Sequence, residues 1–250
     1  MGRDPRELGG AWQSAQRHSF RAPSSALALY VDRYWAVSWE YDRPYRQLVV
    51  PLPQVHLSFH HDHAELHGPC STHVHRDLSG AGSVFGVAFR PGMFGVFLGA
   101  PVASLRDRMV DATTVFGSGL PMVADAATVE RFLLARLPAS DPLAELAAEM
   151  VTTIATDAAV TRVDTLAGRF GIGVRRVQRL FADHVGIGPK WVIRRYRLHE
   201  ITERLAAGGE IDWACLAAEL GYADQAHLSR DFRRIFGEPP TGYAQRYGPG

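Results

Sequence analysis

The spacing of hydrophobic positions changes about halfway along the chain. Between residues 26 and 119, hydrophobic side chains alternate with polar ones, with the period of two that half-buried strands show. In segment 47–60 the hydrophobic residues Val55, Leu57 and Phe59 alternate with the polar residues His56, Ser58 and His60. From residue 121 onward the spacing follows the repeat of an α-helix. We therefore predict an α+β protein with two domains, β-rich first and all-helical second.

Turn sequences separate the predicted strands. Residues 83–89 alternate and then stop at Arg90-Pro91-Gly92, where proline fixes φ and glycine accepts a positive φ. Short strands divided in this way favour a sandwich or a small barrel.

Changes in composition suggest the domain limits. Residues 1–25 are rich in Gly, Pro, Arg and Ser and are expected to form a loose tail. Residues 26–157 form the predicted first domain, with strands up to residue 119 and bridging helices in 121–157. Segment 157–161 is the expected boundary.

Two segments of the C-terminal half share one local plan, about fifty residues apart. Residues 166–171 lead through a glycine to 174–181, and residues 216–221 lead through a glycine to 224–232. Each reads as a short helix, a tight turn and a second helix ending in Arg-x-Phe. This is the layout of a helix-turn-helix unit, whose second helix can enter a DNA major groove.

The helical repeat divides the second helix of each unit into two faces. The expected core faces are Val174, Val177, Leu180 and Phe181 in the first unit, and Leu228, Phe232, Ile235 and Phe236 in the second. The opposite faces and their flanks carry Arg175, Arg176, Gln178 and Arg179, and Ala226, His227, Arg230, Arg233 and Arg234. A guanidinium can read guanine and an amide can read adenine, so both faces carry base-reading chemistry. Asp224 is a good N-cap for its helix, whereas Gly173 is a poorer one.

A long helix joins the two units. It is predicted to begin at Pro189 and to end before Gly208, so its ~19 residues span ~28 Å at 1.5 Å per residue. Successive major grooves on one face of DNA lie ~34 Å apart. A rod of this length can present both second helices to adjacent grooves, with some bending of the DNA.

The charge distribution agrees with a DNA partner. The formal net charge is +1, but residues 160–250 carry 14 basic and 10 acidic side chains. The start of the chain is too polar for a signal peptide, and no stretch is long and apolar enough for a bilayer. Cys70 and Cys215 give no disulfide framework, so we expect a cytoplasmic protein without a membrane partner.

Residues 160–247 resemble the DNA-binding domain of the AraC/XylS family of bacterial transcription regulators, with units at 163–185 and 212–236. The resemblance rests on Leu166-Ala167, Val177 to Phe181, Gly186-x-x-Pro189, Arg194 to Arg197, Leu216-Ala217, Gly221-Tyr222, Asp224 to Phe232, Phe236-Gly237 and Pro240-x-x-Tyr243. It implies that bases are contacted by Arg175, Gln178, Arg179, Gln225, Ala226, His227 and Arg230. It also implies a non-enzymatic regulator, more often an activator, which binds double-stranded promoter DNA and acts on RNA polymerase.

The first domain also resembles a poorly characterised, cupin-like sensor class, through Tyr34-Trp35, Leu48 to Pro51, Gly86 to Gly92 and Gly95. The resemblance implies that it senses a small molecule, mediates homodimerisation, or both. Aromatic residues either line a pocket or, as we favour, fill the core: Trp12, Tyr30, Tyr34, Trp35, Trp39 and Tyr41. Arg90 either clamps a carboxylate or, more commonly, is a plain turn residue. The apolar stripes of 129–137 and 143–154 suit either a dimer interface or, as we favour, packing within one chain.

Histidines are concentrated in one region, since seven of the eleven lie between His56 and His75. On a strand, His56 and His60 would stand ~13 Å apart, too far to share a metal, whereas His73 and His75 would be ~7 Å apart. The run from Gly68 to His75 approaches the first cupin metal motif, but the expected Glu is absent. We therefore expect no cofactor and a histidine-rich surface. The alternative is a metal-dependent cupin-type enzyme using His73 and His75, with Cys70 as a further ligand.

Overall fold

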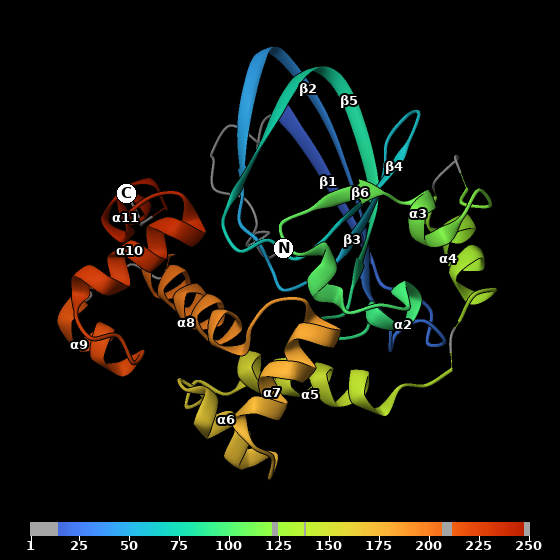
Figure 1. Ribbon diagram of the computed structural model, residues 1–250. Coiled ribbons are helices and arrows are strands. Elements are labelled where there is room, and N and C mark those ends of the chain that lie inside the picture. Colours follow the sequence, from blue (N-terminus) through green and yellow to red (C-terminus); the bar gives the residue numbers. More distant parts are fainter. Residues whose placement is uncertain (1–14, 122–124, 138, 207–211, 248–250) are drawn as a thin grey trace.

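The computed structural model describes residues 15–121, 125–137, 139–206 and 212–247. A strongly curved sheet lies beside a group of helices, and the long helix α8 runs between the two helix-turn-helix units (Figure 1). The strands are β1 Gln16–Arg21, β2 Val31–Val49, β3 His56–Phe59, β4 Ala64–His67, β5 Val74–Phe89 and β6 Met109–Asp111. Both predicted halves are therefore present, β-rich first and helical second.

The six strands form one antiparallel sheet in the order β1-β2-β5-β3-β4-β6, with β1 and β6 at its edges. β2 and β5 pair along most of their length, with an irregularity between Tyr41 and Tyr45, and the two strands arch together over the rest of the sheet (Figure 1). In segment 55–59, Val55, Leu57 and Phe59 are buried as predicted, but Ser58 is buried too, so the expected half-buried strand is wrong for this part of β3. The expectation of a loose tail is wrong for residues 16–21, which are held by pairing with β2.

Short helices cover the outer part of the sheet and close the first hydrophobic core. They are α2 Gly95–Leu98, the 3-10 turn η1 Val102–Leu105, α3 Thr113–Phe116 and α4 Ala126–Leu134. Buried residues of β2, β3 and β5 pack against Phe94, Phe116, Phe132 and Leu133. Tyr30 and Tyr34 belong to this core, as we expected for the aromatic residues, whereas Trp12 lies outside the described residues.

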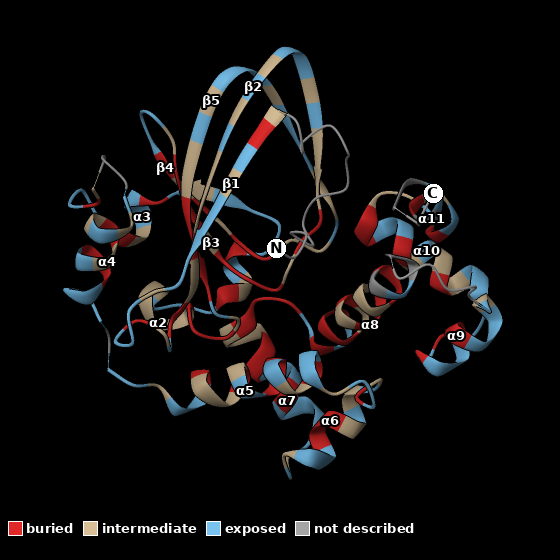
Figure 2. Ribbon diagram, turned by 180° about the vertical axis from the view of Figure 1, so that it is seen from behind, coloured by how far each residue is buried: buried red, intermediate tan, exposed pale blue. Residues whose placement is uncertain are grey.

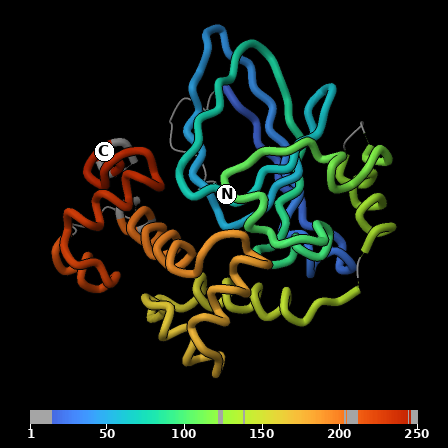
Figure 3. Tube along the Cα trace, viewed as in Figure 1, coloured from blue at the N-terminus to red at the C-terminus, as the bar shows by residue number. Residues whose placement is uncertain are grey.

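The second core is built from the remaining helices. They are α5 Pro142–Thr156, α6 Val163–Arg169, α7 Val174–Leu180, the π-helical turn η2 Phe181–Val185, α8 Pro189–Ala206, α9 Trp213–Glu219, α10 Gln225–Phe236 and α11 Pro240–Tyr247. Within the described ranges, every helix is too short or too polar to cross a bilayer. The tube in Figure 3 shows α8 leading from the first unit to the second.

Helix α5 was expected in the first domain, but most of its buried residues belong to the second core. Ala147, Met150, Val151 and Ile154 are buried in the second core, against residues of α7, η2 and α8. Ala144, near the start of the helix, is buried in the first core, and the partly buried Ala148 packs against it. The packing therefore divides within α5, upstream of the expected boundary at 157–161. The apolar stripes of α4 and α5 are buried within the chain, as we favoured.

Candidate nucleic-acid interface

The second helix of the first unit, α7, exposes the residues that we predicted to read DNA. Arg175, Arg176, Gln178 and Arg179 are exposed, whereas the predicted core residues of this helix are buried: Val177, Leu180 and Phe181. Val174 was predicted on the core face, but 37% of it is exposed. It is the first residue of the helix, where the chain has only just reached the core.

The second helix of the second unit, α10, has the predicted orientation throughout. Its core residues are at most 2% exposed: Leu228, Phe232, Ile235 and Phe236. Gln225, Ala226, Arg230, Arg233 and Arg234 are exposed, and His227 is half-buried. Both units thus alternate buried and exposed positions along their helices (Figure 2).

The two helices begin differently, as their sequences predict. The Asp224 carboxylate accepts a hydrogen bond from the backbone N–H of His227 at 2.7 Å, which satisfies one free donor of the first turn. Gly173 has no side chain with which to cap α7. The chain instead continues from α7 into the turn η2, whose Phe181 and Val185 are buried. The start of α10 is therefore stabilised by a side-chain cap, whereas α7 depends on the packing of its buried residues and of η2.

Charged side chains near the two helices fall into two groups. In the part of the chain that the structure describes, the guanidinium groups of five exposed arginines make no hydrogen bond or ion pair: Arg175, Arg176, Arg179, Arg230 and Arg233. A cation of this kind can bind a phosphate or a base without first breaking an internal contact.

Arg194 of α8 belongs to the other group. Its Nη1 lies 2.8 Å from Asp231 Oδ2, and its guanidinium lies 5.7 Å from the Tyr222 ring centroid. His227, which we predicted as a base contact, is also engaged: its ring meets Tyr222 edge-on at 5.2 Å, and its Nε2 is 3.4 Å from Arg194 Nη2. These contacts hold α10 against α8. His227 therefore helps to position the exposed face of α10 in addition to lying next to it.

Helix α8 is the predicted connecting helix. It carries two buried arginines whose burial the sequence analysis did not predict. Arg195 is 0% exposed and Arg197 is 1% exposed. Arg195 Nε donates to the Pro51 carbonyl at 2.7 Å, while its guanidinium lies 5.2 Å from the Phe236 ring. Arg197 donates to the Ile154 carbonyl and pairs with Glu200 at 2.6 Å. Arg195 thereby joins the segment that follows β2 to the helical half of the chain.

Two further contacts join the halves. The indole N–H of Trp191 in α8 donates to the Ser71 carbonyl at 2.8 Å. The backbone N–H of His73 donates to the Arg234 carbonyl at 3.4 Å, and His73 Nδ1 lies 3.0 Å from the same oxygen. The loop before β5 therefore contacts both the connecting helix and the C-terminal end of α10.

A cavity of about 410 Å³ lies on the inner face of the curved sheet. Its apolar wall includes Trp35 and Trp39, which lie against the glycines opposite them on β5. A Cβ at Gly86 would stand 2.3 Å from the Trp35 ring, and one at Gly82 would stand 2.3 Å from the Trp39 ring. The two glycines thus allow the indoles to lie flat on the sheet. Contrary to the interpretation we favoured, these tryptophans line the pocket.

The polar wall of the cavity comes mainly from β3, β4 and β5. It includes His56, His60, Glu65, His67 and Arg76. Burial, and secondarily the charge of Arg76, lowers the pKa of His67 to about 3, so its ring is neutral and Nδ1 lies 2.9 Å from Arg76 Nη2. Burial also raises the pKa of the Cys70 thiol, which opposes its use as a thiolate ligand.

The histidine pair considered for metal is used differently. The His73 and His75 rings meet edge-on at 5.4 Å, and His73 is held against α10. In the described ranges, three other residues bring possible metal ligands within 4.8 Å of one another, namely His60, His63 and Glu65. The sequence analysis missed this cluster. Recognising β3 and β4 as a hairpin would have brought these three residues together. Arg90 is exposed at its turn and does not line the cavity.

Two families match this chain. Residues 166–246 match a family described as a helix-turn-helix domain, and residues 19–111 match a family described as a domain of unknown function (DUF6597).

Among curated proteins, the chain is similar to transcription regulators. It is 32% identical over 76 residues to the HTH-type transcriptional activator RhaS of Pectobacterium carotovorum subsp. carotovorum (strain PC1), covering 30% of this chain and 27% of that protein. It is 34% identical over 145 residues to a protein of Streptomyces antibioticus named as an AraC-like transcription regulator, covering 57% of this chain and 40% of that protein. The chain thus spans less than half the length of either relative.

Two solved structures give distant likenesses. The C-terminal domain of AraT, a response regulator from Geobacillus stearothermophilus, is 17% identical and covers 44% of this chain and 89% of that chain, with a TM-score of 0.38. An apo ToxT variant from Vibrio cholerae strain SCE256 is 10% identical and covers 91% and 100%, with a TM-score of 0.41. On the family match and the sequence relatives, the C-terminal part of this chain is an AraC-type helix-turn-helix domain, preceded by a domain of unknown function.

Proposed function

We propose that this protein is a sequence-specific transcription regulator that inserts α7 and α10 into adjacent major grooves of promoter DNA. The observation that carries the proposal is the pair of exposed, unpaired arginine faces on the two units. In each unit, buried residues of the same helix fix the direction of those arginines. The assigned reading residues are Arg175, Arg176, Gln178, Arg179, Gln225, Ala226, His227, Arg230, Arg233 and Arg234.

The length of α8 supports binding by both units. Its 18 residues span ~27 Å at 1.5 Å per residue, against ~34 Å between successive grooves on one DNA face. The width of the two units themselves contributes to the remaining separation, and bending of the DNA reduces it. A bound site is therefore expected to contain two half-sites about 10–11 base pairs apart.

The test is selection of binding sites from random duplexes, followed by mobility-shift titration at several salt concentrations. Two conserved half-sites at that spacing, with affinity falling steeply as salt rises, support the proposal. One half-site alone, or binding without dependence on salt, contradicts insertion of both helices.

We further propose that the first domain regulates DNA binding through a small molecule in the sheet cavity. Two segments that line the cavity also contact α8, and these contacts support the proposal. Pro51 lines the cavity and accepts a hydrogen bond from Arg195. Cys70 lines the cavity, and the adjacent Ser71 accepts a hydrogen bond from Trp191. A ligand that moves either segment changes the position of the rod that carries both units. A small molecule that stabilises the chain but leaves DNA affinity unchanged would contradict this coupling.

The expected output is activation through contact with RNA polymerase. A promoter fused to a reporter should then lose expression when the gene is deleted, whereas increased expression would indicate repression. In and next to α4 and α5, the large apolar side chains exposed among the described residues are Leu134, Leu137 and Leu143, so a homodimer would be weak. Sedimentation over a range of concentrations measures it.

A further inference from the structure

The hairpin β3–β4 places three metal-type side chains on one face. Its turn is closed by the backbone N–H of His60, which donates to the His63 carbonyl at 2.8 Å. In this register Ser58 pairs with Glu65, so His60, His63 and Glu65 are neighbours across the two strands. Side chains two residues apart on a strand point to the same face, and two of the three, His60 and Glu65, line the cavity.

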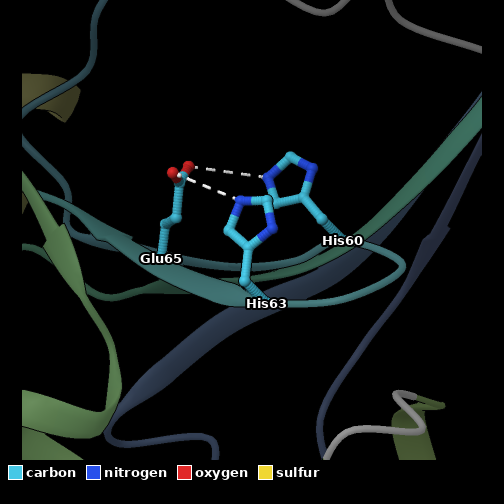
Figure 4. A group of neighbouring side chains, drawn as sticks. All are labelled: His60, His63 and Glu65. Carbon is cyan, nitrogen blue, oxygen red and sulfur yellow. Dashed lines mark ion pairs between the residues drawn. The ribbon is translucent and has the colours of Figure 1, made fainter.

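The donor atoms of this cluster have the separations of a metal site. Glu65 Oε2 lies 3.6 Å from His60 Nε2, and Glu65 Oε1 lies 3.4 Å from His63 Nε2, as the dashed lines of Figure 4 mark. One ligand atom from each residue fits within 4.8 Å of the others. Zinc bonds of ~2.1 Å in tetrahedral geometry require donors ~3.4 Å apart. Only small side-chain movements are needed to bring all three donors to one ion.

Two features of the histidines favour a role as metal ligands over a simple polar cluster. His63 Nδ1 lies 2.6 Å from Asp62 Oδ1, and a carboxylate on one imidazole nitrogen leaves the other as an electron-pair donor. His60 Nε2 is buried and makes no hydrogen bond in the described part of the chain.

We propose that His60, His63 and Glu65 bind one divalent transition-metal ion of the zinc class. Two imidazole nitrogens and one carboxylate oxygen suit zinc better than the hard cations, which prefer oxygen ligands alone. Three protein ligands leave a coordination position open, and His60 and Glu65 line the cavity. The open position therefore faces the space where a small molecule with an oxygen, nitrogen or sulfur donor can reach the ion.

The test is titration of the full-length, metal-free protein with Zn²⁺ in competition with a chromophoric chelator. We expect one ion per chain, and His60→Gln and His63→Gln each lower the affinity at least about 10-fold. His61→Gln is the matched control, because His61 lies exposed in the same turn and outside the cluster. Co²⁺ in place of Zn²⁺ reports the ligand geometry through its visible absorption.

Folding is checked separately by circular dichroism. His63 is exposed, so His63→Gln keeps the fold and its result stands even if His60→Gln unfolds the hairpin. The proposal is overturned if the wild-type chain does not bind one Zn²⁺, or if His61→Gln weakens binding as much as His63→Gln. It is also overturned if His73→Gln abolishes binding while His63→Gln has no effect. The test needs no DNA, so failure of the regulator proposal leaves its result unchanged.

Discussion

Replacement of one arginine in each reading helix tests the proposed interface most directly. Arg179→Ala and Arg230→Ala each remove an exposed guanidinium that makes no hydrogen bond or ion pair within the described residues. Because both side chains are exposed and unpaired in the described part of the chain, the free energy of unfolding should change by less than about 0.5 kcal/mol. Any loss of DNA affinity then reports the interface itself.

The size of that loss follows from what each arginine contacts. A bidentate contact to guanine is worth about 1–3 kcal/mol, so each replacement should weaken specific binding by about 5- to 150-fold. The two residues lie on different units and share no partner, so their effects should add in the double variant. Binding to non-specific DNA should weaken much less, because only one charge is lost per variant.

The assay is a mobility-shift titration of selected sites and of scrambled duplexes at fixed salt. Arg131→Ala, which removes an equal charge from the exposed side of α4, is the matched control and should bind specific DNA like the wild type. Unchanged specific affinity in both Arg179→Ala and Arg230→Ala would refute the assigned reading faces. An equal loss on specific and scrambled DNA would show that the arginines contact only phosphates.

Three other perturbations have defined outcomes. Asp224→Ala removes the N-cap of α10 and should lower the free energy of unfolding by about 1 kcal/mol in urea titrations; no change would mean that packing alone fixes the helix. Gly86→Val places side-chain atoms where Trp35 lies, so small molecules that bind the wild-type cavity should no longer bind by calorimetry; retained binding would place the ligand elsewhere. Hydrogen bonds from Thr128 hold the pKa of Asp125 below its usual value, so this cap stabilises the chain above about pH 4 and its contribution disappears as the pH falls through the lowered pKa. Asp125→Asn should therefore flatten the acid limb of a melting-temperature profile, and an unchanged limb would contradict the cap's role.

The helical half was largely predictable because its information is local. The 3.6-residue repeat of α10 places Leu228 and Phe232 on one side and Arg230 on the other, whatever the helix packs against. The same holds for Asp224, whose side chain caps the helix that it precedes. Two copies of one plan, separated by a helix of suitable length, indicated a domain that reads DNA.

Prediction failed where a residue's environment comes from distant parts of the chain. Burial of Arg195 depends on Pro51, which lies 144 residues earlier and offers its carbonyl only after both halves have folded. Assignment of α5 to the second core depends likewise on α7 and α8. The periodicity of α5 marks its apolar stripe but does not say which neighbour covers it.

The sequence alone therefore determined the two helix-turn-helix units of the C-terminal half and which side of α10 faces solvent. The tertiary structure decided which segments meet: the loop before β5 against α10, the end of β2 against α8, and two strands that gather His60, His63 and Glu65. The physical reason is that periodicity and capping act over a few residues, whereas these contacts form between atoms that only the folded chain brings together.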